Sequence, residues 1–126
     1  MRNRALLIDS FVWLEILQGS TRGTRALGIM DEADDLHTSV VNLYDVSYRV
    51  SQIRDKATAQ DLITSISSHA QVHPVDREIA LAAAPLRIFH GYGTVDALYH
   101  ATAVTLGLSM LTGDLHFKEI QGAILI

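Results

Sequence analysis

The chain has 126 residues, 48% of them hydrophobic, and its 14 acidic and 10 basic residues give a formal charge of −4. This length supports one sizeable core and is too short for two ordinary domains, so we expect a single domain over residues 1–126. The lack of cysteine excludes disulfides, thiolate zinc sites and a cysteine nucleophile, and the lack of a run of roughly 18 apolar residues predicts a soluble, cytoplasmic protein with no membrane partner.

The first half of the chain alternates short apolar runs with helical periodicity. Residues 5–9 form an apolar run that ends in an acid, which predicts a buried parallel strand with Asp9 at its carboxyl end. Residues 11–17 predict a short helix, closed by Gly19 and Ser20. The remaining expected elements are a helix over 21–33, a brief strand within 36–41, a helix from Ser39 to about residue 50 and a helix over 56–68.

The second half is expected to continue this alternation. Residues 69–74 predict a short strand that ends at a proline, and Asp76 begins a helix that Pro85 kinks or breaks. Thr94 is expected to cap a helix that contains Asp96 and ends at Gly107. The prediction closes with a strand over 108–111, a turn over 112–114, a helical turn to Lys118 and a strand over 123–126.

Helices that alternate with short apolar strands predict an α/β fold in which helices cover both faces of a mostly parallel sheet. Folds of this kind bind their ligands outside the carboxyl ends of the strands. Asp9 and Asp114 both follow predicted strands, and Asp96 lies in the first turn of a helix that enters the same region. These acids are therefore expected to converge although they are far apart in the sequence.

A cluster of carboxylates is costly unless a cation lies between them or some are protonated. Mg²⁺ and Mn²⁺ take oxygen ligands, activate water and neutralise charge on a phosphodiester, which is the chemistry of a nuclease. A net charge of −4 argues against binding to a phosphate backbone. Without Asp9, Asp45, Asp96 and Asp114, however, the chain has 10 acids against 10 bases, so a bound divalent ion would offset much of the deficit.

Four segments resemble the PIN domains, and among them the VapC-type toxins of prokaryotic toxin–antitoxin pairs. Leu6-Leu-Ile-Asp-Ser10 is similar to the first strand and acid of that family, and Thr38-Ser-Val-Val-Asn-Leu-Tyr-Asp45 to the segment with the second acid. Asp96-Ala-Leu-Tyr-His-Ala-Thr-Ala103 resembles the helix with the third acid. Leu108-Ser-Met-Leu-Thr-Gly-Asp114 resembles the final strand and turn. The resemblance covers nearly the whole chain.

The resemblance implies one PIN domain, an α/β/α sandwich around four to five short strands, acting as a metal-dependent endoribonuclease. It implies that Asp9, Asp96 and Asp114 coordinate Mg²⁺ or Mn²⁺, and that Asp45 completes the acidic pocket. The family usually has Glu at the second position, so Asp45 is shorter by one methylene. Ser10 and Thr112 are assigned supporting roles. An RNA substrate, a homodimer and a VapB-like antitoxin that blocks the site are implied as well.

Each acid also has an ordinary structural explanation. Asp9 can cap a helix with Ser10, Asp96 can interact with a helix dipole, and Asp114 can be a turn residue. Asp45 interrupts a largely apolar helix, where a salt bridge to Arg49 one turn on would explain it.

Most of the six histidines are interpreted as surface or core residues, although His100 follows Asp96 by one turn and His116 follows Asp114 by two residues. Histidine spacing gives no indication of a zinc site.

Two other functions remain open on sequence grounds. A PIN-like module that binds RNA or assembles without turnover would fit the change from Glu to Asp45 and the acidic net charge. An aspartate-dependent phosphotransfer protein is the second alternative. Against it, a haloacid-dehalogenase phosphatase requires a second Asp where Phe11 stands, and a response-regulator receiver requires an early acidic pair and a late lysine.

Overall fold

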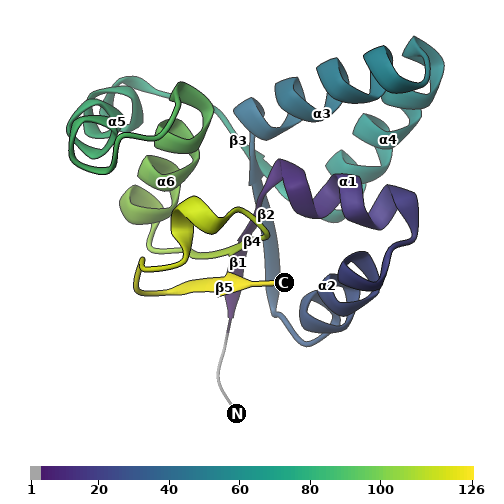
Figure 1. The fold of residues 1–126 in the computed structure, drawn as a ribbon, viewed down its shortest axis with the longest axis horizontal. Coiled ribbons are helices and arrows are strands. Elements are labelled where there is room, and N and C mark those ends of the chain that lie inside the picture. Colours follow the sequence, from purple (N-terminus) through teal and green to yellow (C-terminus); the bar gives the residue numbers. More distant parts are fainter. Residues whose placement is uncertain (1–3) are drawn as a thin grey trace.

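A five-stranded sheet forms the middle layer of the computed structural model, which describes residues 4–126 (Figure 1). The spatial order is β3-β2-β1-β4-β5, and every pair of neighbouring strands is parallel. The expected α/β fold with a parallel sheet is therefore confirmed. The strands are β1 (Ala5–Ile8), β2 (Asp35–Ser39), β3 (Gln71–His73), β4 (Ser109–Thr112) and β5 (Ala123–Leu125).

Six α-helices cover the two faces of this sheet (Figure 1). In β1, Leu6 and Ile8 face one hydrophobic core and Leu7 faces the other, and all three side chains are fully buried. Burial on both faces explains why the strand is apolar throughout. The first core contains α1 (Ser10–Gln18), α2 (Thr21–Asp31), α3 (Val40–Ile53) and α4 (Lys56–His69), and the second contains α5 (Arg77–His90), α6 (Thr94–Leu106) and the 3₁₀ turn η1 (Leu115–Phe117).

The start of α3 follows the sequence prediction. Ser39 is the N-cap residue, and its side chain accepts a hydrogen bond from the backbone N–H of Val41 at 3.2 Å. Asn42 completes a capping box because its side chain accepts from the backbone N–H of Ser39 at 3.0 Å. The cap fixes the direction in which α3 leaves the carboxyl end of β2.

Two local expectations differ from the structure. The break expected at Pro85 is absent, since α5 is continuous from Arg77 to His90, and the alternative of a kink stays a prediction. The proline removes one hydrogen bond to the carbonyl of Leu81, a residue that is 58% exposed, so water is available to that turn. Thr94 does not cap α6: Gly93 is the N-cap residue, and the Thr94 hydroxyl accepts a hydrogen bond from Arg87 Nη1 at 2.7 Å instead.

The chain order of the strands creates a switch point beside β1. The chain passes from β1 to β2 and β3 on one side, then returns through α5 and α6 to β4 and β5 on the other. The carboxyl ends of β1 and β4 are therefore neighbours from which the chain departs to different faces, and such a position forms a crevice in an open α/β sheet. Among residues 4–126, no helix has the length and apolar character to cross a membrane.

Candidate active site

Asp9 lies directly after β1 and is buried, with only 5% of its surface exposed. Its Oδ1 accepts a hydrogen bond from the backbone N–H of Ser10 at 2.7 Å, and its Oδ2 accepts one from Thr112 Oγ1 at 2.6 Å. Asn42 Nδ2 approaches Oδ1 at 3.4 Å. Asp9 therefore caps α1, which is the ordinary structural explanation that the sequence allows, and contacts from three elements hold the carboxylate in one orientation.

Asn42 links the starts of two helices below this carboxylate. Its side chain is fully buried. The Nδ2 group donates to Ser10 Oγ at 3.0 Å, while Oδ1 accepts from the backbone N–H of Ser39 at 3.0 Å and from Thr38 Oγ1 at 3.3 Å. Among the described residues, no buried side-chain nitrogen or oxygen lacks a hydrogen-bond partner, so this polar network is complete.

Thr112 connects Asp9 to the turn that carries Asp114. It is fully buried at the end of β4, and besides donating to Asp9 its hydroxyl accepts from the backbone N–H of Asp114 at 3.0 Å. Asp114 in turn caps η1 by accepting from the backbone N–H of His116 at 2.9 Å. Gly113 lies between them against Phe11, whose ring occupies the space that a Cβ would need.

Asp96 reaches the same region from the first turn of α6. Tyr99, one turn further on, is fully buried and its hydroxyl donates to the carbonyl of Leu7 at 2.7 Å, which fixes α6 against β1. The Asp96 side chain is 21% exposed, and its Oδ2 lies 3.0 Å from His116 Nδ1. The same nitrogen is 3.3 Å from Asp114 Oδ1, so the imidazole of His116 bridges two carboxylates.

Asp45 faces the site from α3 and is paired with Arg49. The Nε of Arg49 donates to Asp45 Oδ1 at 3.0 Å, which is the salt bridge one turn on that the sequence offered as an explanation. The Asp45 side chain is 19% exposed, so Asp9 and not Asp45 is the most deeply buried of the four acids. Arg49 therefore pairs with the charge of Asp45, and both residues still line the site.

All four predicted acids line one pocket beyond the carboxyl ends of β1 and β4. They come from four separate segments: the ends of β1 and β4, the middle of α3 and the start of α6. Arg49 and three apolar side chains complete the pocket, so its lining is acidic in one part and apolar in another. The full lining is Asp9, Phe11, Leu14, Asp45, Arg49, Val95, Asp96 and Asp114.

The acids perturb one another's protonation. Burial is the main cause that raises the pKa of Asp9 to about 7, with smaller contributions from the charges of Asp96 and Asp114, while the Thr112 and Ser10 hydrogen bonds act against it. Burial also raises the pKa of Asp96. The hydrogen bond to Asp96 raises the pKa of His116, with Asp114 adding to the effect. Without a cation, the carboxyl groups of Asp9 and Asp96 therefore hold their protons more strongly than free carboxyl groups do.

The donor atoms of the site fit a hard or borderline divalent cation. Asp96, Asp114 and His116 each offer one ligand atom, and these atoms all lie within 4.8 Å of one another. Carboxylate oxygens are the ligands that Mg²⁺ and Mn²⁺ prefer, and imidazole is accepted by the transition metals. A cation would also offset the charges of Asp96 and Asp114, which contribute a smaller part of the raised pKa of Asp9 after burial.

The model of one protein family, described as PIN domain, matches residues 6–123 of this chain. The chain belongs to the PIN-domain family. This membership disfavours the phosphotransfer alternatives. A search of curated protein sequences found no match.

Solved structures show the same PIN fold at low sequence identity. A toxin–antitoxin complex from Klebsiella pneumoniae is 18% identical, with a TM-score of 0.78 over 94% of this chain and 95% of that chain. VapC20 from Mycobacterium tuberculosis, described as a sarcin–ricin loop cleaving toxin, is 17% identical, with a TM-score of 0.78 over 94% and 96%. VapBC-5 from Mycobacterium tuberculosis is 25% identical, with a TM-score of 0.64 over 94% and 92%.

Two residues of this PIN domain lie at the site although the sequence does not assign them to it, His116 and Asn42. His116 has one visible signal, its position two residues after Asp114. Asn42 carried one signal, its place three residues after the Ser39 cap, where a capping box has its second member. Ser10 and Thr112, both expected to support the site, contact Asp9 through a backbone N–H and a hydroxyl.

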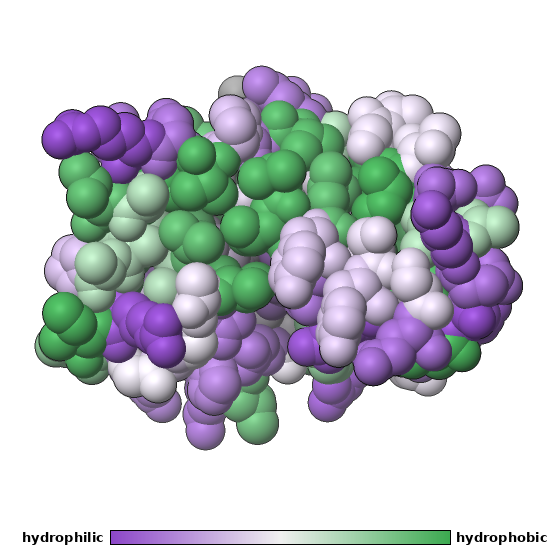
Figure 2. All heavy atoms as spheres, turned by 90° about the horizontal axis from the view of Figure 1, so that it is seen from above, coloured by the Kyte–Doolittle hydropathy of each residue, from purple (hydrophilic) through white to green (hydrophobic). Residues whose placement is uncertain are grey.

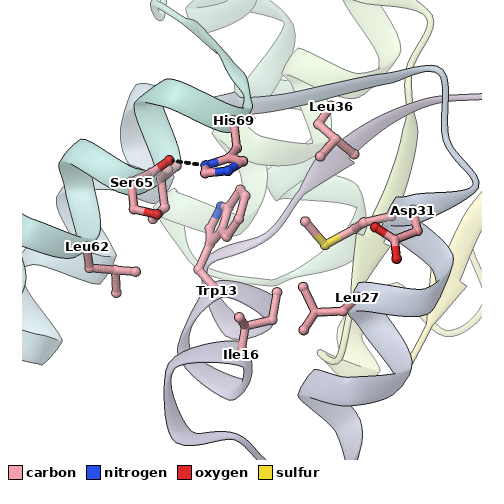
Figure 3. Close-up of a pocket in the computed structure, with 10 residues that line it drawn as sticks. Trp13, Ile16, Leu27, Asp31, Leu36, Leu62, Ser65 and His69 are labelled. Atoms are coloured by element: carbon pink, nitrogen blue, oxygen red, sulfur yellow. Dashed lines mark hydrogen bonds between the residues drawn. The ribbon is translucent and has the colours of Figure 1, made fainter.

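An apolar groove lies apart from the acidic pocket, between α1, α2 and α4 (Figure 3). Trp13 stands in its centre, with His69 and Ser65 on one side and Leu27 and Asp31 on the other. The Trp13 indole N–H donates to Thr38 Oγ1 at 3.2 Å. Of the ten lining residues, seven are apolar: Trp13, Ile16, Leu27, Met30, Leu36, Leu62 and Ile66.

Proposed function

We propose that this PIN domain is a metal-dependent endoribonuclease of the VapC type. The observation that carries the proposal is the convergence of Asp9, Asp45, Asp96 and Asp114 in one pocket at the switch point of the sheet. Membership in the PIN family and the fold shared with VapC toxins support it. RNA as the substrate and a divalent metal as the cofactor are parts of this proposal.

Asp9, Asp96 and Asp114 are the proposed ligands of Mg²⁺ or Mn²⁺, and Asp45 completes the acidic pocket. A bound ion would supply an activated water and neutralise charge on the phosphodiester. Thr112 and Ser10 hold Asp9 in place through the contacts described above. Arg49 lines the pocket beside Asp45 and is 57% exposed, so its guanidinium is available to a backbone phosphate.

Cleavage of a structured RNA by the purified chain tests the proposal. The wild type should cut in Mg²⁺ or Mn²⁺ and stop in EDTA, and Asp9→Asn and Asp96→Asn should lose the activity. Asp61→Asn is the matched control, because Asp61 is an exposed aspartate on α4 outside the pocket. Full activity in both site variants contradicts the proposal, and RNA binding without cleavage by the wild type supports the non-catalytic alternative instead.

A small VapB-like antitoxin is the proposed partner, since several of the structures that share this fold are toxin–antitoxin complexes. The apolar groove between α1, α2 and α4 offers a surface for its apolar side chains (Figure 3). Trp13 is the only tryptophan in the chain and lines this groove. Antitoxin binding should therefore change the tryptophan emission of the toxin when the antitoxin lacks tryptophan, and a stable complex with unchanged emission would place the contact elsewhere.

A homodimer is proposed from the apolar surface that remains exposed. Figure 2 shows hydrophobic side chains spreading across the face seen from above. On α3, Tyr44 and Tyr48 are 64% and 55% exposed, and on α5, Ile88 and Phe89 are 84% and 83% exposed. Large side chains with apolar rings or chains that stay exposed are candidates for protein interfaces. A cytoplasmic location stays a prediction from the sequence.

A further inference from the structure

His116 is directed at the acidic pocket by the segment that carries it. The neighbouring Phe117 is fully buried and packs against the rings of Tyr99 and Tyr92, so η1 is anchored to the core on one side. The backbone N–H of His116 donates to Asp114, which fixes the turn on the other. The His116 side chain is itself 61% exposed, and its polar contacts are with Asp96 and Asp114. Core packing of Phe117 therefore positions the turn, and the two acids hold the exposed imidazole of His116.

The spacing of these groups matches ligands on adjacent corners of one coordination sphere. In an octahedral site with metal–ligand bonds of about 2.1 Å, adjacent ligand atoms lie about 3.0 Å apart. His116 Nδ1 lies 3.0 Å from Asp96 Oδ2 and 3.3 Å from Asp114 Oδ1. The nitrogen is therefore spaced from both oxygens as adjacent ligands of one ion would be, and all three atoms lie within 4.8 Å of one another.

We propose that His116 Nδ1 is a direct ligand of the divalent ion together with Asp96 and Asp114, and that this nitrogen makes the site prefer Mn²⁺ over Mg²⁺. The inference rests on the proposed metal-dependent function and specifies its cofactor. Mg²⁺ is a hard ion that binds oxygen and retains water, so an imidazole adds little to its affinity. Mn²⁺ is a first-row transition ion and accepts an imidazole more readily than Mg²⁺ does, so the nitrogen raises the affinity for Mn²⁺ relative to Mg²⁺.

The test is direct detection of a nitrogen ligand on bound Mn²⁺. Electron spin-echo modulation of the Mn²⁺ complex should show coupling to ¹⁴N in the wild type and lose it in His116→Gln. His69→Gln is the matched control because His69 is an exposed histidine on α4, outside the acidic pocket, and it should keep the coupling. Because the His116 side chain is 61% exposed, its replacement should leave the fold intact, and circular dichroism of both variants checks this.

Calorimetry measures the selectivity of the site for Mn²⁺ over Mg²⁺. His116→Gln should weaken Mn²⁺ binding about tenfold or more, since even outer partners of metal sites contribute at least this much, and should leave Mg²⁺ affinity nearly unchanged. Wild-type Mn²⁺ binding without ¹⁴N coupling, or an unchanged Mn²⁺-to-Mg²⁺ affinity ratio in His116→Gln, would overturn the inference while the nuclease proposal stands. Failure of the wild type to bind either ion would overturn both.

Discussion

Among single residues, Asp9 shows most clearly how burial in the fold changes the pKa of a side chain. The sequence predicted an acid at the end of a strand, and the structure buries that acid between Ser10, Asn42 and Thr112. Burial raises its pKa from 3.8 to about 7, so the metal-free folded state keeps a proton that the unfolded chain releases. A group of this kind stabilises the fold below its unfolded pKa and loses that contribution as pH rises toward the folded pKa.

In EDTA, Asp9→Asn should therefore gain stability relative to the wild type as pH rises. A shift from 3.8 to about 7 corresponds to about 4 kcal/mol, so the difference in unfolding free energy should change by that order between pH 4 and pH 8. Urea unfolding at a series of pH values measures it. Asp55→Asn is the contrasting control, because the Thr58 N–H lowers the pKa of Asp55 and its stabilisation is lost as pH falls. A pH-independent difference for Asp9→Asn would contradict the buried-acid assignment.

Asn42 provides a second residue-scale prediction. Asn42→Ala removes the partners of the Ser39 N–H and Ser10 Oγ in a fully buried position, and should lower the free energy of unfolding by about 1–3 kcal/mol. Asn42→Asp keeps the size and the acceptor but places a second carboxylate beside Asp9, so its loss should grow from pH 5 to pH 8. Equal stability of the Ala variant and the wild type in urea would show that the network is dispensable.

How far the site could be predicted differs between its members. Asp9, Asp96 and Asp114 could be placed together because each follows a strand or begins a helix at the same edge. The bridging contact of His116 depends on where η1 lies against α6, which no local pattern encodes. His37 and His73, which had no recognisable spacing, are 2.8 Å apart across β2 and β3 because those strands pair in parallel.

At the scale of elements, local signals predicted every strand and helix, and they failed where tertiary contacts decide. Ser39 and Asp76 cap their helices as their residue types suggest. Thr94 does not, because its hydroxyl is engaged by Arg87 from the neighbouring helix. Pro85 sits within α5, where packing of that helix against α6 outweighs the loss of one backbone hydrogen bond.

The packing of α1 against α2 leaves no room for an added methyl group at Gly23. A Cβ on Gly23 would meet the backbone carbonyl of Glu15, so Gly23→Ala must push the helices apart and should destabilise the protein by about 1–3 kcal/mol. A Cβ on Gly28 in the same helix would have no such heavy atom within 4 Å, and Gly28→Ala should stabilise by up to about 1 kcal/mol. Thermal unfolding that shifts in the same direction for both variants would contradict this packing.

At the scale of the whole molecule, the sheet order explains why one pocket gathers residues from across the chain. Because β1 and β4 are neighbours, Asp9 and Thr112 meet although 103 positions separate them. The apolar–helical alternation predicted the parallel sheet, but it did not specify the order of the strands, which depends on non-local pairing. The order β3-β2-β1-β4-β5 is given by the structure, and a toxin–antitoxin structure shares this fold.

The proposed homodimer can be tested at the exposed apolar residues of α5. Replacing Ile88 and Phe89 together by serine removes two of the most exposed apolar side chains and should shift the protein toward monomer in light scattering. Val104→Ser, on α6 with 62% exposure, is the control for a general loss of surface hydrophobicity. A wild type that is monomeric at all tested concentrations would contradict the dimer.

The proposed activity is hydrolysis of RNA at the four-aspartate pocket by a metal-activated water. Cleavage in H₂¹⁸O, followed by mass spectrometry of the first products, tests this chemistry. Direct hydrolysis predicts one ¹⁸O in each new terminal phosphate, no 2′,3′-cyclic phosphate, and no product from Asp96→Asn. A 2′,3′-cyclic phosphate end formed by the wild type would show that the RNA's own hydroxyl is the nucleophile, and would contradict hydrolysis by a metal-activated water.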